Sequence, residues 1–252
     1  MPSMRSWPIR QLTHWATAVL CAAACCRAAE VAPVKEPRAD DPPSIGEVMV
    51  AAFQGDAKSQ FTLGLMYEQR DSFTNAVRWY RKSADQGNAE AQFKIGWFHT
   101  TGQGVPRDYA QAARWFQQAA EKNLVAAQYN LAVCCEKGYG LPTNYAAALT
   151  WYMKAAAQGD EFAQKAVGVF YERGKGVPVD LAEAYKWYHL AAGCGNPDGI
   201  KLRDLLLPRL TPQQLAEAGR RYADYAASQP GGNLTARPAT AKPRPKPADF
   251  LE

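Results

Sequence analysis

The side chains that could do chemistry in this chain are few and scattered. Beyond residue 29, the chain has only two histidines, His99 and His189, and three cysteines, Cys134, Cys135 and Cys194. An imidazole beside a thiol could supply a base and a nucleophile, and the same groups at close spacing could bind zinc. No histidine stands at ligand spacing from the cysteines, and no nucleophile-elbow or phosphate-loop string occurs. The sequence therefore predicts no catalytic residue, no metal site and no cofactor.

The same residues have simpler structural roles. Adjacent cysteines such as Cys134 and Cys135 are badly placed to bridge each other, and an odd number of cysteines does not build a disulfide framework. We expect free and mostly buried thiols. His99 lies where other copies of an internal repeat have tyrosine, so we expect a packed or hydrogen-bonded ring, whereas His189 is expected to be exposed.

An internal repeat is the element that must position these residues. Four tryptophans recur every 36 residues, and each is followed by another aromatic residue: Trp79-Tyr80, Trp115-Phe116, Trp151-Tyr152 and Trp187-Tyr188. A period of this length is typical of a repeat architecture, in which stacked units present surfaces. We expect all four indole rings to lie in the core and not in a ligand cage.

Turn and cap residues recur with the same period. Helix N-cap types stand seven residues before each tryptophan, at Ser72, Asp108, Asn144 and Asp180. Residues that tolerate the left-handed conformation recur at Gly87, Asn123, Gly159 and Gly195, where they predict helix C-termini. The second helix of each unit is thus bounded at both ends.

A first helix precedes each of these second helices. It carries a small residue at the point where we expect the two helices to cross: Gly64, Gly96, Ala132 and Gly168. Glycine-rich turns that end in proline follow in three copies, at 102–106, 138–142 and 174–178. The first copy lacks this turn, as terminal repeats often differ from the rest.

These strings resemble the Sel-one-like repeat family, a relative of the tetratricopeptide repeat. The resemblance rests on AEAQFKIGWFHTTGQGVPRDYAQAARWFQQAAEKN and on the parallel runs that begin at Ala126 and Glu161. It implies an all-α fold, an α-solenoid in which antiparallel helix pairs form a right-handed superhelix that binds proteins, often in envelope or secretory assemblies. Cys135 and His99, where the family usually has tyrosine, and Lys165, where phenylalanine or tyrosine is common, depart from the pattern.

The flanking segments complete the expected organisation. Residues 1–29 have the layout of a signal peptide, with Arg5 and Arg10, the apolar run Trp15–Cys26, and small residues after it. The alternative is an uncleaved membrane anchor. The expected parts are a signal peptide (1–29), a disordered linker (30–43), a capping helix (44–54), repeats 1 to 4 (55–86, 87–122, 123–158 and 159–194), closing helices (195–228) and a disordered, basic, proline-rich tail (229–252).

The charge distribution argues against nucleic acid. The net charge of +5 comes from residues 1–29, which carry +3, and residues 229–252, which carry +2. The segment between them is neutral, and a nucleic-acid reader should show a basic stripe on its folded part. After removal of the signal, no stretch is long and apolar enough to span a membrane.

The leading hypothesis is a non-enzymatic scaffold, periplasmic or extracellular, whose concave face binds a peptide or protein. By analogy with related arrays, this face uses first-helix residues. Trp97 is the most suggestive, because the equivalent positions in the other copies are aliphatic. The candidates are Phe61, Leu65, Glu68, Phe93, Trp97, Thr100, Tyr129, Val133, Glu136, Lys165, Val169 and Glu172.

The alternative hypothesis is an enzyme, or the regulator of an enzyme, that acts on cell-wall or β-lactam material. Some members of the resembled family carry a cysteine in every helix pair and bind penicillin. This chain lacks that cysteine spacing and offers no nucleophile with a nearby base.

Overall fold

The computed structural model describes residues 44–229, and it is built from helices. No strand occurs among these residues. The helices are α2 (Ile45–Gln54), α3 (Ala57–Glu68), α4 (Phe73–Asp85), α5 (Ala89–Thr101), α6 (Tyr109–Glu121), α7 (Val125–Lys137), α8 (Tyr145–Ala157), α9 (Glu161–Arg173), α10 (Leu181–Gly193), α11 (Pro197–Leu206) and α12 (Pro212–Ser228), with a short 3₁₀ turn, η2 (Leu207–Arg209), between the last two.

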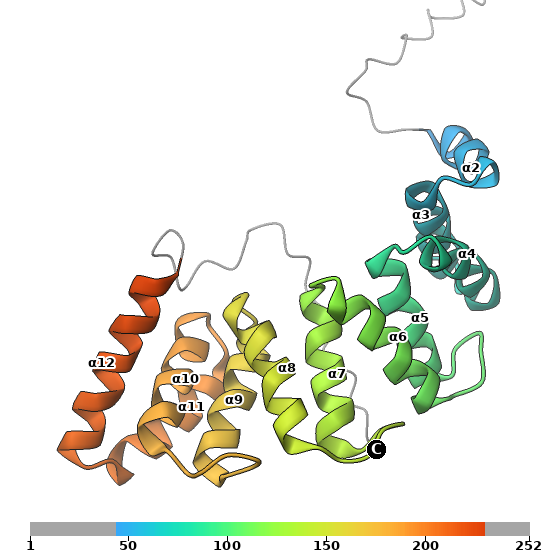
Figure 1. Ribbon diagram of the computed structural model, residues 1–252. Helices are drawn as coiled ribbons and strands as arrows, with labels where there is room; N and C mark the ends of the chain where they lie inside the picture. The colour runs from blue at the N-terminus through green and yellow to red at the C-terminus, as the bar shows by residue number, and fades with distance from the viewer. Residues whose placement is uncertain (1–43, 230–252) are drawn as a thin grey trace, which may run out of the picture. The chain divides into compact units, whose positions relative to one another are not determined.

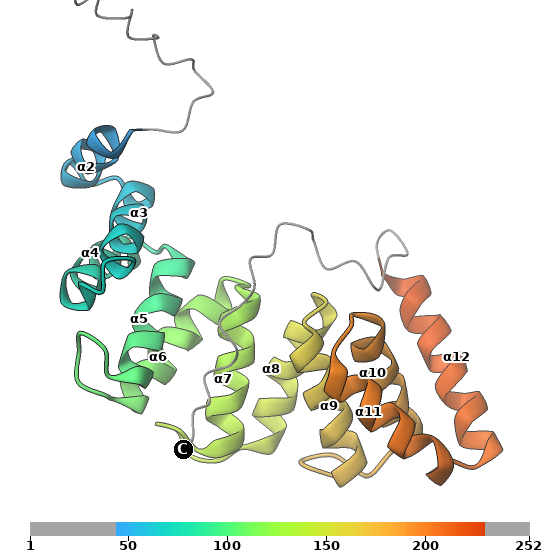
Figure 2. The same ribbon diagram turned by 180° about the vertical axis from the view of Figure 1, so that it is seen from behind.

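Each helix packs mainly on its neighbours in sequence. The pairs α3–α4, α5–α6, α7–α8 and α9–α10 form the four repeats, and α4–α5, α6–α7 and α8–α9 join one repeat to the next. Both views show this order, and α12 lies beside α10 at the end of the array (Figures 1 and 2). The fold is the all-α solenoid of antiparallel helix pairs that the sequence predicts.

The helix α2 takes the place of a second helix from a missing repeat. It begins with a capping box, in which Ser44 Oγ accepts from the Glu47 N–H and Glu47 returns a bond to the Ser44 N–H. Its Ala52 carbonyl accepts a hydrogen bond from Gln60 of α3, at 3.1 Å. The corresponding glutamines of later repeats bond in the same way to the preceding second helix, so α2 covers the open end of the array.

The predicted N-cap positions are confirmed at all four second helices. The side chains of Asp108, Asn144 and Asp180 accept hydrogen bonds from backbone N–H groups in the first turn. Ser72 is the N-cap residue of α4, but its side chain makes no capping hydrogen bond. In the shortened turn Ser72 has φ −86° and ψ 61°, and its Oγ accepts from the Asn75 side chain instead of from the backbone.

The glycines of the first helices lie where the two helices of a repeat cross, as predicted. A Cβ on Gly64 would lie 2.6 Å from the Tyr80 ring, and one on Gly168 would lie 2.5 Å from the Tyr188 ring. Such distances are well inside van der Waals contact, so in these two repeats the glycine lets the aromatic ring approach the helix backbone closely. The left-handed residues at the ends of the second helices are also confirmed, including Asn123 with φ 67°.

The expectation that all four tryptophans are core residues is wrong for two of them. Trp79 and Trp187 are buried, but Trp115 and Trp151 are half-buried. The aromatic residue after each tryptophan faces the crossing glycine or alanine and is the true core residue, at most 2% exposed in every repeat. The half-buried indoles lie under cations, with Arg81 5.4 Å from the Trp115 ring centre and Lys154 3.9 Å from that of Trp151.

The predictions for the two chain ends concern residues that the structure does not describe. The predicted signal peptide (1–29), the linker (30–43) and residues 230–252 of the predicted tail lie outside the described residues. Within 44–229, none of the helices combines the length and the hydropathy that crossing a bilayer requires.

Candidate partner-binding surfaces

The first-helix residues chosen from the sequence are divided between packing and exposure. Phe61, Phe93 and Tyr129 occupy one position of the repeat, and their rings lie 5.5, 5.7 and 5.5 Å from the core aromatics Tyr80, Phe116 and Tyr152. All three are half-buried, so one edge of each ring remains accessible. In the fourth repeat Lys165 takes this position and pairs with Asp198 of α11, at 2.8 Å.

The next position, one helical turn along, is more uniform. Leu65, Trp97, Val133 and Val169 are all half-buried. The three aliphatic residues pack at the edges of the hydrophobic clusters. Trp97 is the largest side chain in this position and the only aromatic one among the four.

The glutamates in the last position of the predicted face tie the solenoid together. Glu68, Glu136 and Glu172 each accept a hydrogen bond from the tyrosine hydroxyl of the second helix in the same repeat. Each glutamate also pairs with a cation farther along the chain: Glu68 with Lys94 and Glu136 with Lys175, both at 2.8 Å, and Glu172 with Arg209. Thr100 stands in this position in the second repeat, where it is buried and its Oγ1 donates to the Gly96 carbonyl.

These tyrosines are structural donors, not acids or bases. Burial, reinforced by the hydrogen bond to the adjacent carboxylate, raises the pKa of Tyr80 and of Tyr188 far above the ordinary value. The pKa of Tyr152 is raised by burial and by Glu136. All three hydroxyls remain protonated at neutral pH, which is what the hydrogen bond to a carboxylate requires.

The thiols and imidazoles do not form a reactive centre. Cys134 and Cys135 are free thiols, and burial raises the pKa of Cys134 to about 12, so this thiol carries no thiolate at neutral pH. His99 is buried, and its Nδ1 lies 3.4 Å from the Pro106 carbonyl. His189 packs beside Tyr185 and Tyr222, and burial lowers its pKa. Within residues 44–229 no group of three or more histidine, cysteine or acidic side chains could hold a metal ion.

A series of buried glutamines joins the repeats and was missed by the sequence reasoning. Gln92, Gln128 and Gln164 donate from Nε2 to second-helix carbonyls of the preceding repeat, those of Ala84, Ala120 and Ala156, at 3.3, 3.4 and 3.3 Å. They stand 36 residues apart, and each follows a buried alanine, which is the signal that could have revealed them. Buried amides that bond to the next unit fix the register of the stack.

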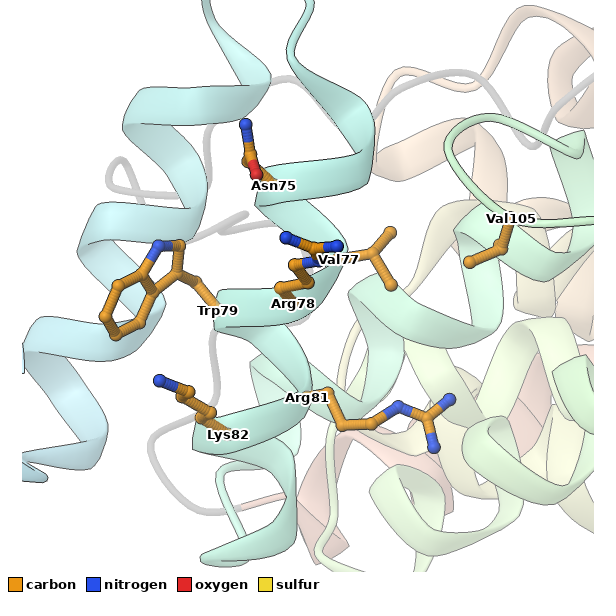
Figure 3. Close-up of a pocket in the computed structure, with 7 residues that line it drawn as sticks. All are labelled: Asn75, Val77, Arg78, Trp79, Arg81, Lys82 and Val105. Carbon is orange, nitrogen blue, oxygen red and sulfur yellow. The ribbon is translucent and has the colours of Figure 1, made fainter.

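A basic pocket on α4 is the other surface that the sequence reasoning missed. Its volume is about 540 Å³, and Figure 3 shows the residues that line it. Val77 of α4 and Val105 of the turn after α5 face each other across it in this view. The remaining lining residues are Asn75, Arg78, Trp79, Arg81 and Lys82.

Stacked helix pairs that are interlocked by buried amides define a helical-repeat protein. Comparison with known families identifies the family of helical repeats. The Sel1 repeat family model matches residues 57–88, 89–124, 125–160 and 162–196, more than half of the chain. The chain therefore belongs to the Sel1 repeat family, whose members usually act as protein-interaction scaffolds.

A solved structure of a similar protein agrees with this assignment, and a second similar structure is also known. A Sel1 repeat protein from Oxalobacter formigenes is 31% identical, with a TM-score of 0.59 over 74% of this chain and 76% of that chain. The protective antigen c5321 of uropathogenic Escherichia coli, described as an SLR fold, is 28% identical over 72% of this chain and 48% of that chain, with a TM-score of 0.49.

One curated protein is similar over a shorter stretch. It is the rat (Rattus norvegicus) protein DAP3-binding cell death enhancer 1, which is 37% identical over 65 residues. The match covers 24% of this chain and only 13% of the length of the rat protein.

Proposed function

We propose that this protein is a non-enzymatic scaffold that binds a peptide or protein partner along its first helices. The proposal rests above all on Trp97, which gives the second repeat a half-buried indole where the other repeats have smaller aliphatic groups. Trp97 lies one turn from the half-buried ring of Phe93 on α5. Large aromatic side chains with one exposed face are the residues that most often anchor a partner.

The packing of the other predicted residues reduces the number of residues that could contact the ligand. The three glutamates are already bonded to tyrosines and cations, and Thr100 is buried, so these four residues would position the face more than touch the ligand. The contact surface that remains is a row of partly exposed apolar groups on successive first helices. Such a row suits an extended peptide or a helix with apolar residues at regular spacing.

The protonated state of the buried thiol supports the non-enzymatic part of the proposal. A cysteine nucleophile needs a lowered pKa and a nearby base, whereas burial raises the pKa of all three thiols here. We further propose that the partner lies outside the cytoplasm, in the cell envelope, because residues 1–29 have the layout of a signal peptide. A phosphatase reporter fused after residue 43 should be active only if this export takes place.

The test of the binding surface is a site-specific photo-crosslink. A benzophenone amino acid at position 97 should capture a partner in intact cells, and the same residue at position 151 should not. Trp151 is the matched control, because it is also half-buried but belongs to a second helix. Equal capture from both positions, or capture from position 151 alone, would move the contact surface away from the first helices.

A further inference from the structure

The second helix of the first repeat concentrates positive charge on its exposed surface. Arg78, Arg81 and Lys82 are all exposed on α4. Among residues 44–229 they take part in no ion pair, whereas Lys94, Lys175, Lys186 and Arg221 elsewhere are paired with carboxylates. Three cations on one helix surface repel each other, which costs stability unless an anion relieves it.

The same three positions are not basic as a set in any other described repeat. They read Arg114, Gln117 and Gln118 in α6, Thr150, Met153 and Lys154 in α8, and Lys186, His189 and Leu190 in α10. The repeat unit therefore does not need cations there to fold. The charge of α4 is a property of this one repeat, placed on a scaffold whose residues 30–228 carry no net charge.

Aromatic rings hold two of the cations in place. Lys82 Nζ lies 4.3 Å from the Trp79 ring centre, and the Arg81 guanidinium lies 5.4 Å from that of Trp115 in the next repeat. Trp79 is itself fixed by the edge of Phe53 from α2, at 5.1 Å. Cations that are held over indole faces lose less freedom when they bind an anion, so these contacts preorganise the site.

The pocket between these cations has apolar walls. In Figure 3, Arg78 lies between Trp79 and Val77, and Val105 closes the opposite side. A pocket of about 540 Å³ accommodates one or two amino-acid side chains. It offers contact to an apolar group in the middle and ion pairs to carboxylates around it.

We infer that this pocket on α4 binds an acidic peptide segment of a partner, with an apolar side chain against Val77 and Val105 and flanking carboxylates on Arg78, Arg81 and Lys82. Charge complementarity carries this assignment. A nucleic acid fits less well, because phosphate recognition needs cations along an extended stripe, and here they are confined to one helix of a neutral array. The site is separate from the first-helix face and does not depend on it.

The test uses a fluorescein-labelled peptide of alternating glutamate and leucine, with fluorescence anisotropy as the readout. The full-length protein should bind it, and binding should weaken as salt is raised. The triple variant R78Q/R81Q/K82Q should bind about tenfold more weakly, as three partly solvated ion pairs would together contribute. A peptide with glutamine in place of glutamate should lose affinity to a similar degree.

Lys154 provides a matched control. It stands three residues after Trp151, as Lys82 stands three after Trp79, and it also lies over its indole, but α8 lacks the other two cations. Lys82→Gln should therefore weaken binding, and Lys154→Gln should not. Circular dichroism melting of each variant shows whether the fold is retained.

Several results would overturn the inference. They are a failure of the wild-type protein to bind the acidic peptide, equal binding of the glutamine peptide, and unchanged binding by the triple variant. A single-stranded oligonucleotide that binds more tightly than the peptide, and loses that binding in the triple variant, would reassign the pocket to phosphate recognition.

Discussion

Repeats 2 and 3 have helices of equal length and the same turn, yet they join their helices by different means. In repeat 3 the Tyr152 hydroxyl donates to Glu136 at 2.9 Å, and Lys175 pairs with the same carboxylate. In repeat 2 the equivalent positions are Phe116, Thr100 and Tyr139. All three members of the polar group are replaced together, and Tyr139 stacks on Tyr109 instead, at 5.2 Å between ring centres.

The difference shows that the fold does not require the tyrosine–glutamate hydrogen bond and its paired cation, which we call the polar link. The ring of Phe116 still lies against Gly96, where a Cβ would come within 2.7 Å of it, so the helices cross in the same way. A buried hydroxyl without an acceptor, or a buried carboxylate without donors, would cost more than the link contributes. The hydroxyl, the carboxylate and the cation are therefore either all present in a repeat or all absent from it.

The largest effect is expected at the glycine-rich turn between α7 and α8 of repeat 3, which contacts the start of α6 in repeat 2. Gly140 has φ 71°, and a Cβ on it would overlap the backbone of Tyr109 and Ala110 at the start of α6. Backbone cannot move aside as a side chain can, so Gly140→Ala should lower the free energy of unfolding by about 3 kcal/mol or more. Urea unfolding followed by circular dichroism measures this loss.

Gly159→Ala separates the clash from the backbone strain. Gly159 also has a positive φ, of 84°, but a Cβ there meets nothing within 4 Å. It should cost only about 1 kcal/mol, the usual penalty for a left-handed alanine. Equal losses in the two variants would mean that the contact between the turn and α6 does not hold repeats 2 and 3 together.

Much of this architecture could be predicted from the sequence because it depends on local backbone chemistry. Asp108, Asn144 and Asp180 cap helices whatever lies around them, and Asn123 accepts a left-handed conformation with little help from its neighbours. Ser72 also occupies an N-cap position, but in the shortened first turn its side chain makes no capping hydrogen bond. The residue type therefore predicts where the helix begins, whereas the capping hydrogen bond also depends on the turn before it.

The side-chain links could not be predicted, because they depend on how each helix is rotated about its axis. Adjacent aromatics such as Trp151 and Tyr152 have similar apolar character, but only one of them can face the partner helix. The repeat period of the sequence identified the glutamates as members of one face. Their tyrosine partners lie 12 or 16 residues away and their cation partners 26 to 39 residues away, at distances in sequence that no local pattern encodes.

The next largest effect should come from adding the missing hydroxyl to repeat 2. Phe116 is fully buried, and Thr100 is shorter than the glutamate that accepts the hydroxyl in the other repeats. Phe116→Tyr should therefore leave a buried hydroxyl unpaired and destabilise the protein by about 2 kcal/mol. The variant T100E/F116Y/Y139K, which supplies the whole set, should recover most of this loss. If the triple variant is no better than the single one, the set does not act as a unit.

A smaller loss is expected when the link is removed from repeat 3. Tyr152→Phe keeps the ring and deletes one hydrogen bond, while Lys175 still pairs with Glu136. The expected cost is about 1 kcal/mol, measured as a lower urea midpoint. In a background that already carries Glu136→Gln, the same change should cost less, because the carboxylate that strengthens the bond is gone. An undiminished cost would place the effect in the ring packing.

The smallest expected effect is a gain in stability. It comes from a substitution that removes a second difference between repeats 2 and 3. In repeat 3 the Oε1 of Gln128 accepts a hydrogen bond from Gln158 at 2.8 Å. In repeat 2 the equivalent residues are Gln92 and Lys122. Lys122 does not donate to Gln92, whose Oε1 is buried without a hydrogen-bond partner. Lys122 is exposed, and its Nζ donates to the Gly87 carbonyl. Lys122→Gln should raise stability by about 1 kcal/mol, because it satisfies a buried acceptor at the cost of one exposed bond. The gain should vanish in a Gln92→Ala background, and a gain that persists there would have to come from the lost charge.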